Sequence, residues 1–124
     1  MARSANVNPT DGELELLQIL WRAGPVGLGE ICRSMRRRRP VAATTVATML
    51  KVMLDKKLVH RRRGPQGYLW SAKTTRKRAA SGMIRKLVDS VFDGSAGRLV
   101  AHLMESDELS DEERSELQRL IQPK

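Results

Sequence analysis

The 124-residue chain has few residues with redox, metal-binding or stacking chemistry: one Cys, two His, two Trp, one Tyr and one Phe. The single Cys32 excludes an intrachain disulfide and a cysteine-based metal cluster. No apolar run approaches the roughly 18 to 20 residues of a membrane span, and the N-terminal "MARSANVNPTDGE" lacks a signal-peptide core. We therefore expect a soluble cytoplasmic protein without membrane insertion, whose core is mainly aliphatic.

The sequence also lacks the constellations of common enzymes. His60 and His102 are solitary, and no carboxylates or cysteines stand near them at metal-ligand spacing. The nucleophile pattern GxSxG and the nucleotide patterns GxxxxGKS/T and GxGxxG are missing. Cys32 falls on the apolar side of a predicted helix, where a small core residue is a better interpretation than a redox sensor. The prediction is a protein without catalysis, metal or other cofactor.

Positive charge is concentrated in one part of the chain. Residues 1–80 hold 17 Lys and Arg against 5 Asp and Glu, a net +12, whereas residues 81–124 hold 6 against 9, a net −3. A basic region favours a polyanionic partner, because each neutralised phosphate releases counterions. The alternative is that these cations form ordinary solvated surface. The acidic remainder carries apolar stripes, which suggest contact with another protein.

Helix signals open the chain. In "TDGE", Thr10 and Glu13 can form a capping box before an apolar stripe at helical spacing, and "AGP" ends that helix with Gly24 at the position favouring glycine. A second helix is predicted over residues 28–37, and Pro40 prevents its continuation.

A third helix is predicted over residues 43–57, with two dissimilar faces. The apolar face, expected to be buried, consists of Val46, Met49, Leu50, Met53 and Leu54. The opposite face consists of Thr44, Thr45, Thr48, Lys51 and Asp55. Alternation and turn residues then predict a hairpin with strands 58–63 and 68–72 around the tip "GPQG". Three short helices and a basic hairpin predict a winged helix-turn-helix domain over residues 8–73, in a mainly α (α+β) protein.

The remaining residues, 74–122, are predicted to be helical. Thr74 can cap a long helix, "FDGSAG" breaks it, a short helix follows, and the capping box "SDEE" starts a last one. Short amphipathic helices bury too little surface to fold alone, so we expect this region to pair with a second copy. The expected dimerisation residues are Ile84, Leu87, Val88, Val91, Leu99, Val100, Leu103, Leu117, Leu120 and Ile121.

The third helix would be the recognition helix, whose N-terminal residues meet base edges in the major groove. Hydroxyls and methyls of Thr, like the methyl of Ala, suit base edges and thymine methyls. The predicted base-reading residues are Thr44, Thr45, Ala47 and Thr48. The alternative for these small residues is close packing between helices.

Phosphate contacts are predicted around this helix. Lys51 lies one turn further along it, and arginines flank the hairpin tip, where the alternative role is to guard an exposed strand edge. Four arginines in succession, residues 36–39, point all round a helix, so at most two can reach phosphate together. The helix start at Thr10 could also meet a phosphate. The predicted phosphate-binding residues are Thr10, Arg38, Arg39, Lys51, Arg61, Arg62 and Arg63.

Three segments together resemble the penicillinase repressor family along residues 10–121: "TDGELELLQILWRAGPVGLGEI", "TTVATMLKVMLDKKLVHRR" and "LVDSVFDGSAGRLVAHLMESDELSDEERSELQRLI". The resemblance implies a homodimeric transcriptional repressor that binds an inverted-repeat operator on double-stranded DNA, controlling β-lactam-response or related genes. Thr45 and Thr48 match threonines of the family's recognition helix. Thr44 and Ala47 stand where the best-known members have lysine and arginine, so the resemblance does not carry their operator sequence to this chain.

The resemblance also implies a release mechanism, in which a membrane-linked sensor and metallopeptidase system triggers cleavage of an Asn–Phe bond. His102 and Leu103 occupy the corresponding positions, so cleavage there is unsupported and another release mechanism is open. The C-terminal Cys-x-Cys pair of copper-responsive relatives is missing, which argues against copper sensing. Two other functions stay open from the residues: an architectural, nucleoid-associated protein that coats DNA without sequence preference, and a protein-interaction module with an incidental basic surface.

Overall fold

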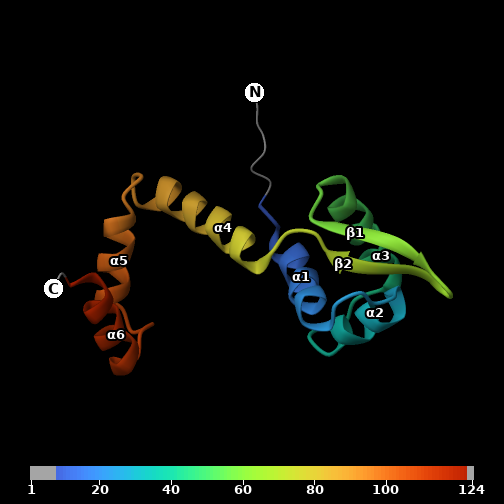
Figure 1. Ribbon diagram of the computed structural model, residues 1–124, viewed down its shortest axis with the longest axis horizontal. Helices are drawn as coiled ribbons and strands as arrows, with labels where there is room; N and C mark the ends of the chain where they lie inside the picture. The colour runs from blue at the N-terminus through green and yellow to red at the C-terminus, as the bar shows by residue number, and fades with distance from the viewer. Residues whose placement is uncertain (1–7, 123–124) are drawn as a thin grey trace. The chain divides into compact units, whose positions relative to one another are not determined.

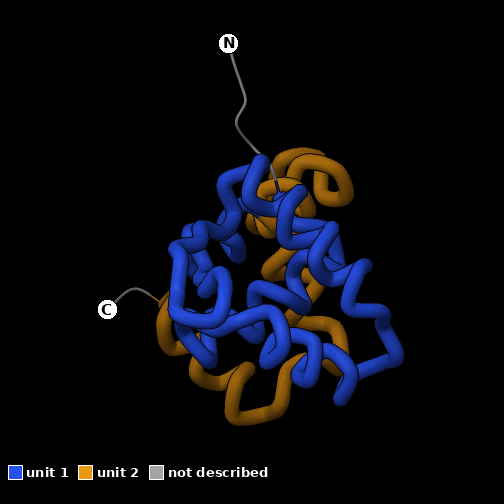
Figure 2. The backbone as a smooth tube through the Cα atoms, turned by 90° about the vertical axis from the view of Figure 1, so that its right-hand side faces the viewer, with its two compact units in different colours: residues 1–82 blue, residues 83–124 orange. Residues whose placement is uncertain are grey.

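The computed structural model describes residues 8–122, in the order α1-α2-α3-β1-β2-α4-α5-α6 (Figure 1). Residues 1–7, which belong to the N-terminal segment assessed for a signal peptide, and residues 123–124 lie outside the described part. The chain forms two compact units that divide between Gly82 and Met83 (Figure 2). This division lies inside α4, slightly later than the boundary between residues 73 and 74 expected from the sequence.

Helix α1 (Asp11–Ala23) begins and ends at the predicted signals. The Glu13 amide donates to the Thr10 hydroxyl at 3.2 Å, and the Thr10 amide donates to the Glu13 carboxylate at 3.0 Å. These two bonds satisfy donors that a helix start leaves unpaired. Gly24 ends the helix with a φ of 78°, a conformation that glycine adopts at little cost.

Helices α2 (Leu28–Arg36) and α3 (Ala43–Asp55) follow as predicted, but α3 ends before residue 57. Lys57 has a φ of 64°, which stops the right-handed helix, and the Leu58 amide then donates to the Met53 carbonyl at 2.9 Å. This tight exit turns the chain directly into the sheet.

The hairpin is formed by β1 (Val59–Gly64) and β2 (Gly67–Ala72), with Arg61 opposite Trp70. Its turn is shorter than the predicted four-residue tip, because Gly64 and Gly67 pair with each other and leave two residues in the turn. A contact that the sequence did not indicate extends the sheet: Val26 and Trp70 exchange backbone hydrogen bonds of 2.8 and 3.0 Å.

A single aliphatic core joins these elements. Each of the three helices and both strands contributes side chains that are almost completely buried. The largest of those less than 2% exposed are Leu16, Leu17, Leu20, Ile31, Met35, Val46, Leu50, Met53 and Val59. Cys32 belongs to the same core, as its place on the apolar side of α2 predicts. The core fixes the orientation of α3 relative to the hairpin, which positions the surface described below.

Helix α4 (Arg76–Val91) begins one residue later than predicted. The Arg78 amide donates to the Thr75 hydroxyl, not to Thr74, so the expected Thr74 cap is wrong. Instead, the backbone of Thr74 is hydrogen-bonded within the winged-helix unit. Its amide donates to the Leu58 carbonyl, and its carbonyl accepts from Trp21 Nε1 at 2.9 Å. Because both of these groups are used inside the winged-helix unit, the helix starts beyond them.

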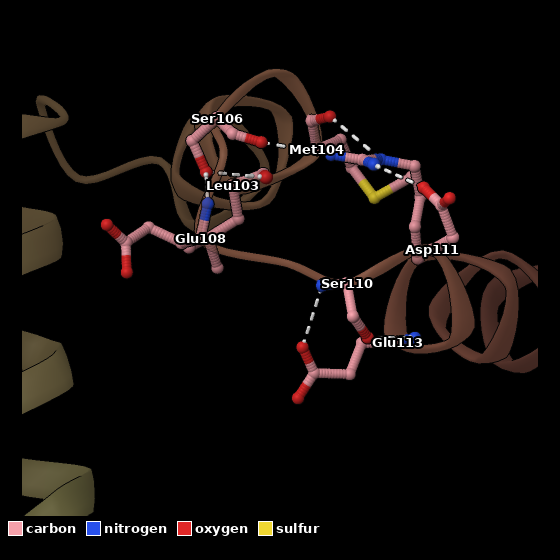
Figure 3. A network of polar contacts seen from close by, with 8 residues as sticks. Leu103, Met104, Ser106, Glu108, Ser110, Asp111 and Glu113 are labelled. Atoms are coloured by element: carbon pink, nitrogen blue, oxygen red, sulfur yellow. Dashed lines mark hydrogen bonds and ion pairs between the residues drawn. The ribbon is translucent and has the colours of Figure 1, made fainter.

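The second unit comprises the rest of α4, α5 (Ala96–Glu105) and α6 (Asp111–Ile121). Figure 3 shows the polar network between α5 and α6, including the capping box of Ser110 and Glu113. Arg114 donates to the carbonyls of Met104 and Ser106 at 3.1 and 3.0 Å, which satisfies acceptors at the end of α5. In the described chain, no helix has the length and apolarity needed to cross a membrane.

Candidate nucleic-acid interface

The outer face of α3 carries the predicted base-reading threonines. Thr44, Thr45 and Thr48 are exposed, whereas Val46, Leu50 and Met53 on the opposite side are buried. Ala47 lies between the two faces and is half-buried. Close helix packing would have required the threonines to be covered, so these short polar side chains do not serve packing within the described chain. They are available to a partner.

A groove of about 800 Å³ lies beside this face, between α3, the start of α2 and the hairpin. Ala47 and Lys51 form its α3 wall, and the hairpin contributes Arg61 and residues 65–70. Gly27, Leu28 and Gly29 at the start of α2 form the third wall. The α2 N-terminus has no side-chain cap, so first-turn N–H groups lack a side-chain acceptor there. The start of α2 was not among the predicted phosphate sites, although Gly27 has no side chain to cap the helix, which the sequence shows.

The charge of this groove is mainly positive. Lys51 and Arg61 line it together with Arg33 and one acid, Glu30. Arg33 donates to the Glu30 carboxylate at 2.6 Å, and this hydrogen bond lowers the pKa of Glu30 below its usual value. The acid is therefore ionised and paired at neutral pH, which leaves Lys51 and Arg61 as the unbalanced charges of the groove.

The three hairpin arginines lie in different surroundings. Arg61 lies over the ring of Tyr68, 4.0 Å from its centroid, and Arg63 lies 5.2 Å from the same centroid. Such cation–π contacts restrict the guanidinium groups, and the strand register puts both arginines on the hairpin face that carries Tyr68 and Trp70. Arg62 pairs across the strands with Leu69 on the other face and is exposed. The aromatic Trp70 is buried in the core, so it packs rather than presenting a face for stacking on bases.

Arg38 and Arg39 are engaged by α1. Arg38 donates to Gln18 at 2.9 Å, and Arg39 donates to the Glu15 carboxylate at 2.8 and 3.2 Å. The Arg39 hydrogen bond lowers the pKa of Glu15, and the same bond raises the pKa of Arg39. Phosphate binding would require both arginines to exchange partners, and their assignment stays a prediction. Their observed role, anchoring the α2–α3 connection to α1, was missed from the sequence, although Glu15 and Gln18 share a helix face.

Thr10 and its helix start are also occupied by internal contacts. Besides bonding the Thr10 amide, the buried Glu13 carboxylate accepts from Lys56 Nζ at 2.9 and 3.1 Å. This ion pair connects the start of α1 with the end of α3, and nothing in the spacing of the two residues indicated it. The phosphate contact predicted for Thr10 stays a prediction.

The predicted dimerisation residues form a largely uncovered set in the second unit. Five are between 41% and 71% exposed: Ile84, Leu87, Val91, Leu120 and Ile121. Four are half-buried: Leu99, Val100, Leu103 and Leu117. Val88 differs, because it is buried within the single chain and is not on its surface.

The two residues that correspond to the family's cleavage bond lie in regular helix. His102 is exposed and Leu103 half-buried, both within α5, and the His102 ring packs 5.7 Å from that of Phe92. Across residues 8–122, no three His, Cys, Asp or Glu side chains are grouped so that they could hold a metal ion.

A buried core that leaves one polar face of α3 exposed beside a basic hairpin is typical of winged-helix DNA-binding regulators. Comparison with known proteins adds the family. The family described as penicillinase repressor matches residues 9–123. The penicillinase repressor of Bacillus licheniformis is 19% identical over 113 residues, which cover 91% of this chain and 88% of that protein. The chain belongs to the penicillinase repressor family, whose members are transcriptional repressors rather than enzymes.

Two solved structures are also similar. The zinc-responsive MarR family member ZitR of Lactococcus lactis aligns with a TM-score of 0.47 at 20% identity, over 95% of this chain and 75% of that chain. A single-residue mutant of ZitR aligns with a TM-score of 0.48 at 16% identity, over 96% and 75%.

Proposed function

We propose that the protein represses transcription by binding, as a homodimer, an operator made of two inverted half-sites. In each protomer, Thr44, Thr45 and Thr48 of α3 read base edges. Ala47 contacts a base methyl beside them. The two-fold symmetry of a dimer would match that of the operator. We further propose that the controlled genes are β-lactam-response or related genes, in line with the name of the Bacillus relative.

One observation carries this proposal: the threonine face of α3 is exposed at the edge of the basic groove. A DNA backbone entering the groove would meet Lys51 and Arg61 from two sides and the N–H groups of the first turn of α2 from a third. Charged side chains and helix N-termini are the usual donors to phosphate oxygens. Arg62, on the other face of the hairpin, would add an independent phosphate contact.

The test separates base reading from phosphate binding. An operator is first selected from random duplexes with the purified protein, and affinities for operator and scrambled DNA are then measured by fluorescence anisotropy over a series of salt concentrations. Thr48→Ala should weaken operator binding by about 1 to 3 kcal/mol while leaving scrambled DNA nearly unaffected. Arg62→Ala should weaken both and reduce the salt slope by about one. Arg119→Ala, which removes an exposed arginine of α6, is the matched control.

Two results would contradict the proposal. If no duplex is enriched over random DNA, the arginine excess would instead serve a coating, nucleoid-associated protein. If Thr48→Ala and Arg62→Ala lose the same affinity on both DNAs, base reading by α3 is wrong.

Dimerisation is proposed from the uncovered apolar side chains of the second unit. Large exposed apolar side chains gathered on short amphipathic helices favour an interaction site, and a second copy would bury both sets. Leu87→Glu should shift sedimentation toward the monomer, because it places a charge among these side chains. Lys86→Glu, on the preceding exposed position, is the control. A wild-type protein that sediments as a monomer at micromolar concentration would contradict a homodimer.

For release from the operator we do not propose cleavage between residues 102 and 103. That bond lies inside α5, where a protease would first have to unwind the helix. We propose a membrane-linked sensor and metallopeptidase partner from the family resemblance alone. The test is to incubate the protein with membranes from cells in which the controlled genes are induced, and to sequence any fragments that form.

A further inference from the structure

A second pocket lies in the winged-helix unit, at the base of the hairpin. It has a volume of about 540 Å³, within the range of roughly 300 to 1,000 Å³ common for small-molecule sites. Its walls come from the residues before α1, the exit of α3 and the segment that leads into α4. Figure 1 shows this segment at the opposite end of the hairpin from the tip. The pocket is thus separate from the groove beside Lys51 and Arg61.

The pocket is strongly basic. Lys56, Lys57, Lys73 and Arg78 line it, against the single acid Asp55. Lys56 is paired with Glu13, whereas the other three cations form no ion pair with any residue from 8 to 122. A hollow lined by one sign of charge concentrates the opposite ion, because its low-dielectric walls focus the field.

The backbone holds these cations in place. The Lys57 amide donates to the Leu54 carbonyl at 3.1 Å, and the Lys73 amide donates to the Leu58 carbonyl at 2.9 Å. Both lysines therefore have hydrogen-bonded backbones next to Leu58, which Lys57 precedes in the chain and to which Lys73 is bonded. A ligand that meets both would not have to order a loop, which reduces the entropic cost of binding.

A buried hydroxyl adds a second, independent observation. Thr74 lines the pocket and is 9% exposed. Its amide and carbonyl are bonded to Leu58 and Trp21, but its hydroxyl has no hydrogen-bond partner in the described chain. Buried polar groups are nearly always satisfied. An oxygen-rich ligand in the pocket would supply the missing acceptor.

We propose that this pocket binds a compact anion with at least two adjacent negative groups, as in a diphosphate. Ammonium groups of lysine bind phosphate oxygens as point charges, and the Thr74 hydroxyl can donate to one of them. The site is separate from the proposed DNA groove, because the two cavities share no lining residue.

The test uses the full-length protein and inorganic pyrophosphate in isothermal titration calorimetry at constant ionic strength. We expect saturable binding at one site per chain. Lys57→Gln combined with Lys73→Gln should weaken it by about tenfold or more, because two nearby charges are removed. Arg22→Gln combined with Lys77→Gln removes two exposed cations outside the pocket and should leave binding within about twofold of wild type. Thr74→Val, which removes the hydroxyl alone, should weaken binding by about three- to tenfold.

Several outcomes would overturn the proposal: no saturable binding at millimolar pyrophosphate, equal losses in both double variants, or loss of binding in Arg62→Ala, which would move the site to the hairpin. Thermal unfolding without ligand checks that each variant is folded. If the double lysine variant does not fold, Thr74→Val still tests the proposal. Citrate in place of pyrophosphate distinguishes the ligand class. Tighter binding of pyrophosphate supports a phosphate site, and binding of citrate alone would overturn the diphosphate assignment.

Discussion

The two units of this chain differ in how many side chains they bury and in how their segments are held together. In the winged-helix unit, every helix from α1 to α3 and both strands bury side chains in one core. Two of its ion pairs join distant segments, Glu15 with Arg39 and Glu13 with Lys56. In the described part of the second unit, Val88 alone is buried, and α5 and α6 bury none of their residues.

This difference indicates what each unit needs in order to fold. The second unit is organised by local hydrogen bonds. These are the Ser95 and Ser110 helix caps and the bonds from Arg114 to carbonyls at the end of α5. Local hydrogen bonds define helix ends, but they contribute little free energy compared with a buried core. The winged-helix unit therefore has the buried core needed to fold alone, whereas we expect the second unit to require that its apolar side chains be covered.

The largest expected effect comes from separating the units. A fragment of residues 1–82 should unfold cooperatively in urea, followed by circular dichroism, at a midpoint independent of protein concentration. A fragment of residues 74–124, which keeps α4 whole, should show no cooperative transition at low micromolar concentration, because a chain of this size rarely buries enough surface alone. Concentration-independent, cooperative folding of the second fragment as a monomer would break the comparison.

Core truncation tests the first unit directly. Leu50→Ala removes a side chain that is 0% exposed and should lower the free energy of unfolding by about 2 to 5 kcal/mol. Val52→Ala on the same helix removes a side chain that is 42% exposed and should cost less than about 1 kcal/mol. Urea denaturation at one fixed protein concentration measures both. Similar losses for the two variants would mean that α3 is covered on both sides.

The elements of the winged-helix unit were largely predictable, because each has a local signal. The Thr10–Glu13 box, the apolar face of α3 and the glycines of the hairpin act over a few residues, and the chain forms the elements they indicate. The family resemblance, confirmed by the match over residues 9–123, supplied the order of the segments.

The errors and omissions arise where distant residues meet. The Thr74 cap failed because Leu58 and Trp21 already hold the Thr74 backbone, and these contacts span many residues. The exchange of hydrogen bonds between Val26 and Trp70 leaves no periodic pattern. The exposure of Thr44, Thr45 and Thr48 followed from the helical period, whereas the engagement of Arg39 by Glu15 depends on how α1 packs.

The two capping boxes allow the units to be compared with the same chemistry. Thr10→Ala should destabilise the winged-helix unit by about 1 kcal/mol, because α1 carries much of the core and its start loses an acceptor. Ser110→Ala removes the same kind of acceptor from α6 and should leave the winged-helix unfolding transition unchanged, while helix content falls. Circular dichroism and urea denaturation report the two quantities. If Ser110→Ala destabilises the winged-helix unit as much as Thr10→Ala, the two units unfold as one.

The smallest expected effect concerns the ion pair between α1 and the α2–α3 connection. Hydrogen bonding by Arg39 lowers the pKa of Glu15 below its usual 4.5, so the ionised carboxylate is favoured in the folded state. The pair's contribution to stability is therefore fully present above pH 4.5 and is lost as the pH falls through the lowered pKa of the folded state.

Glu15→Gln should accordingly be slightly less stable than wild type near pH 7, and the difference should shrink as the pH is lowered below about 4.5. Glu30→Gln is the control, because its partner Arg33 lies on the same short helix and the pair closes no contact between segments. Thermal unfolding of the three proteins between pH 3 and 7 provides the comparison. A wild-type advantage over Glu15→Gln that grows toward acid pH would reverse the sign and show that Arg39 does not stabilise the carboxylate. An advantage no larger than that over Glu30→Gln would mean that distant ion pairs contribute no more to this unit than local pairs do.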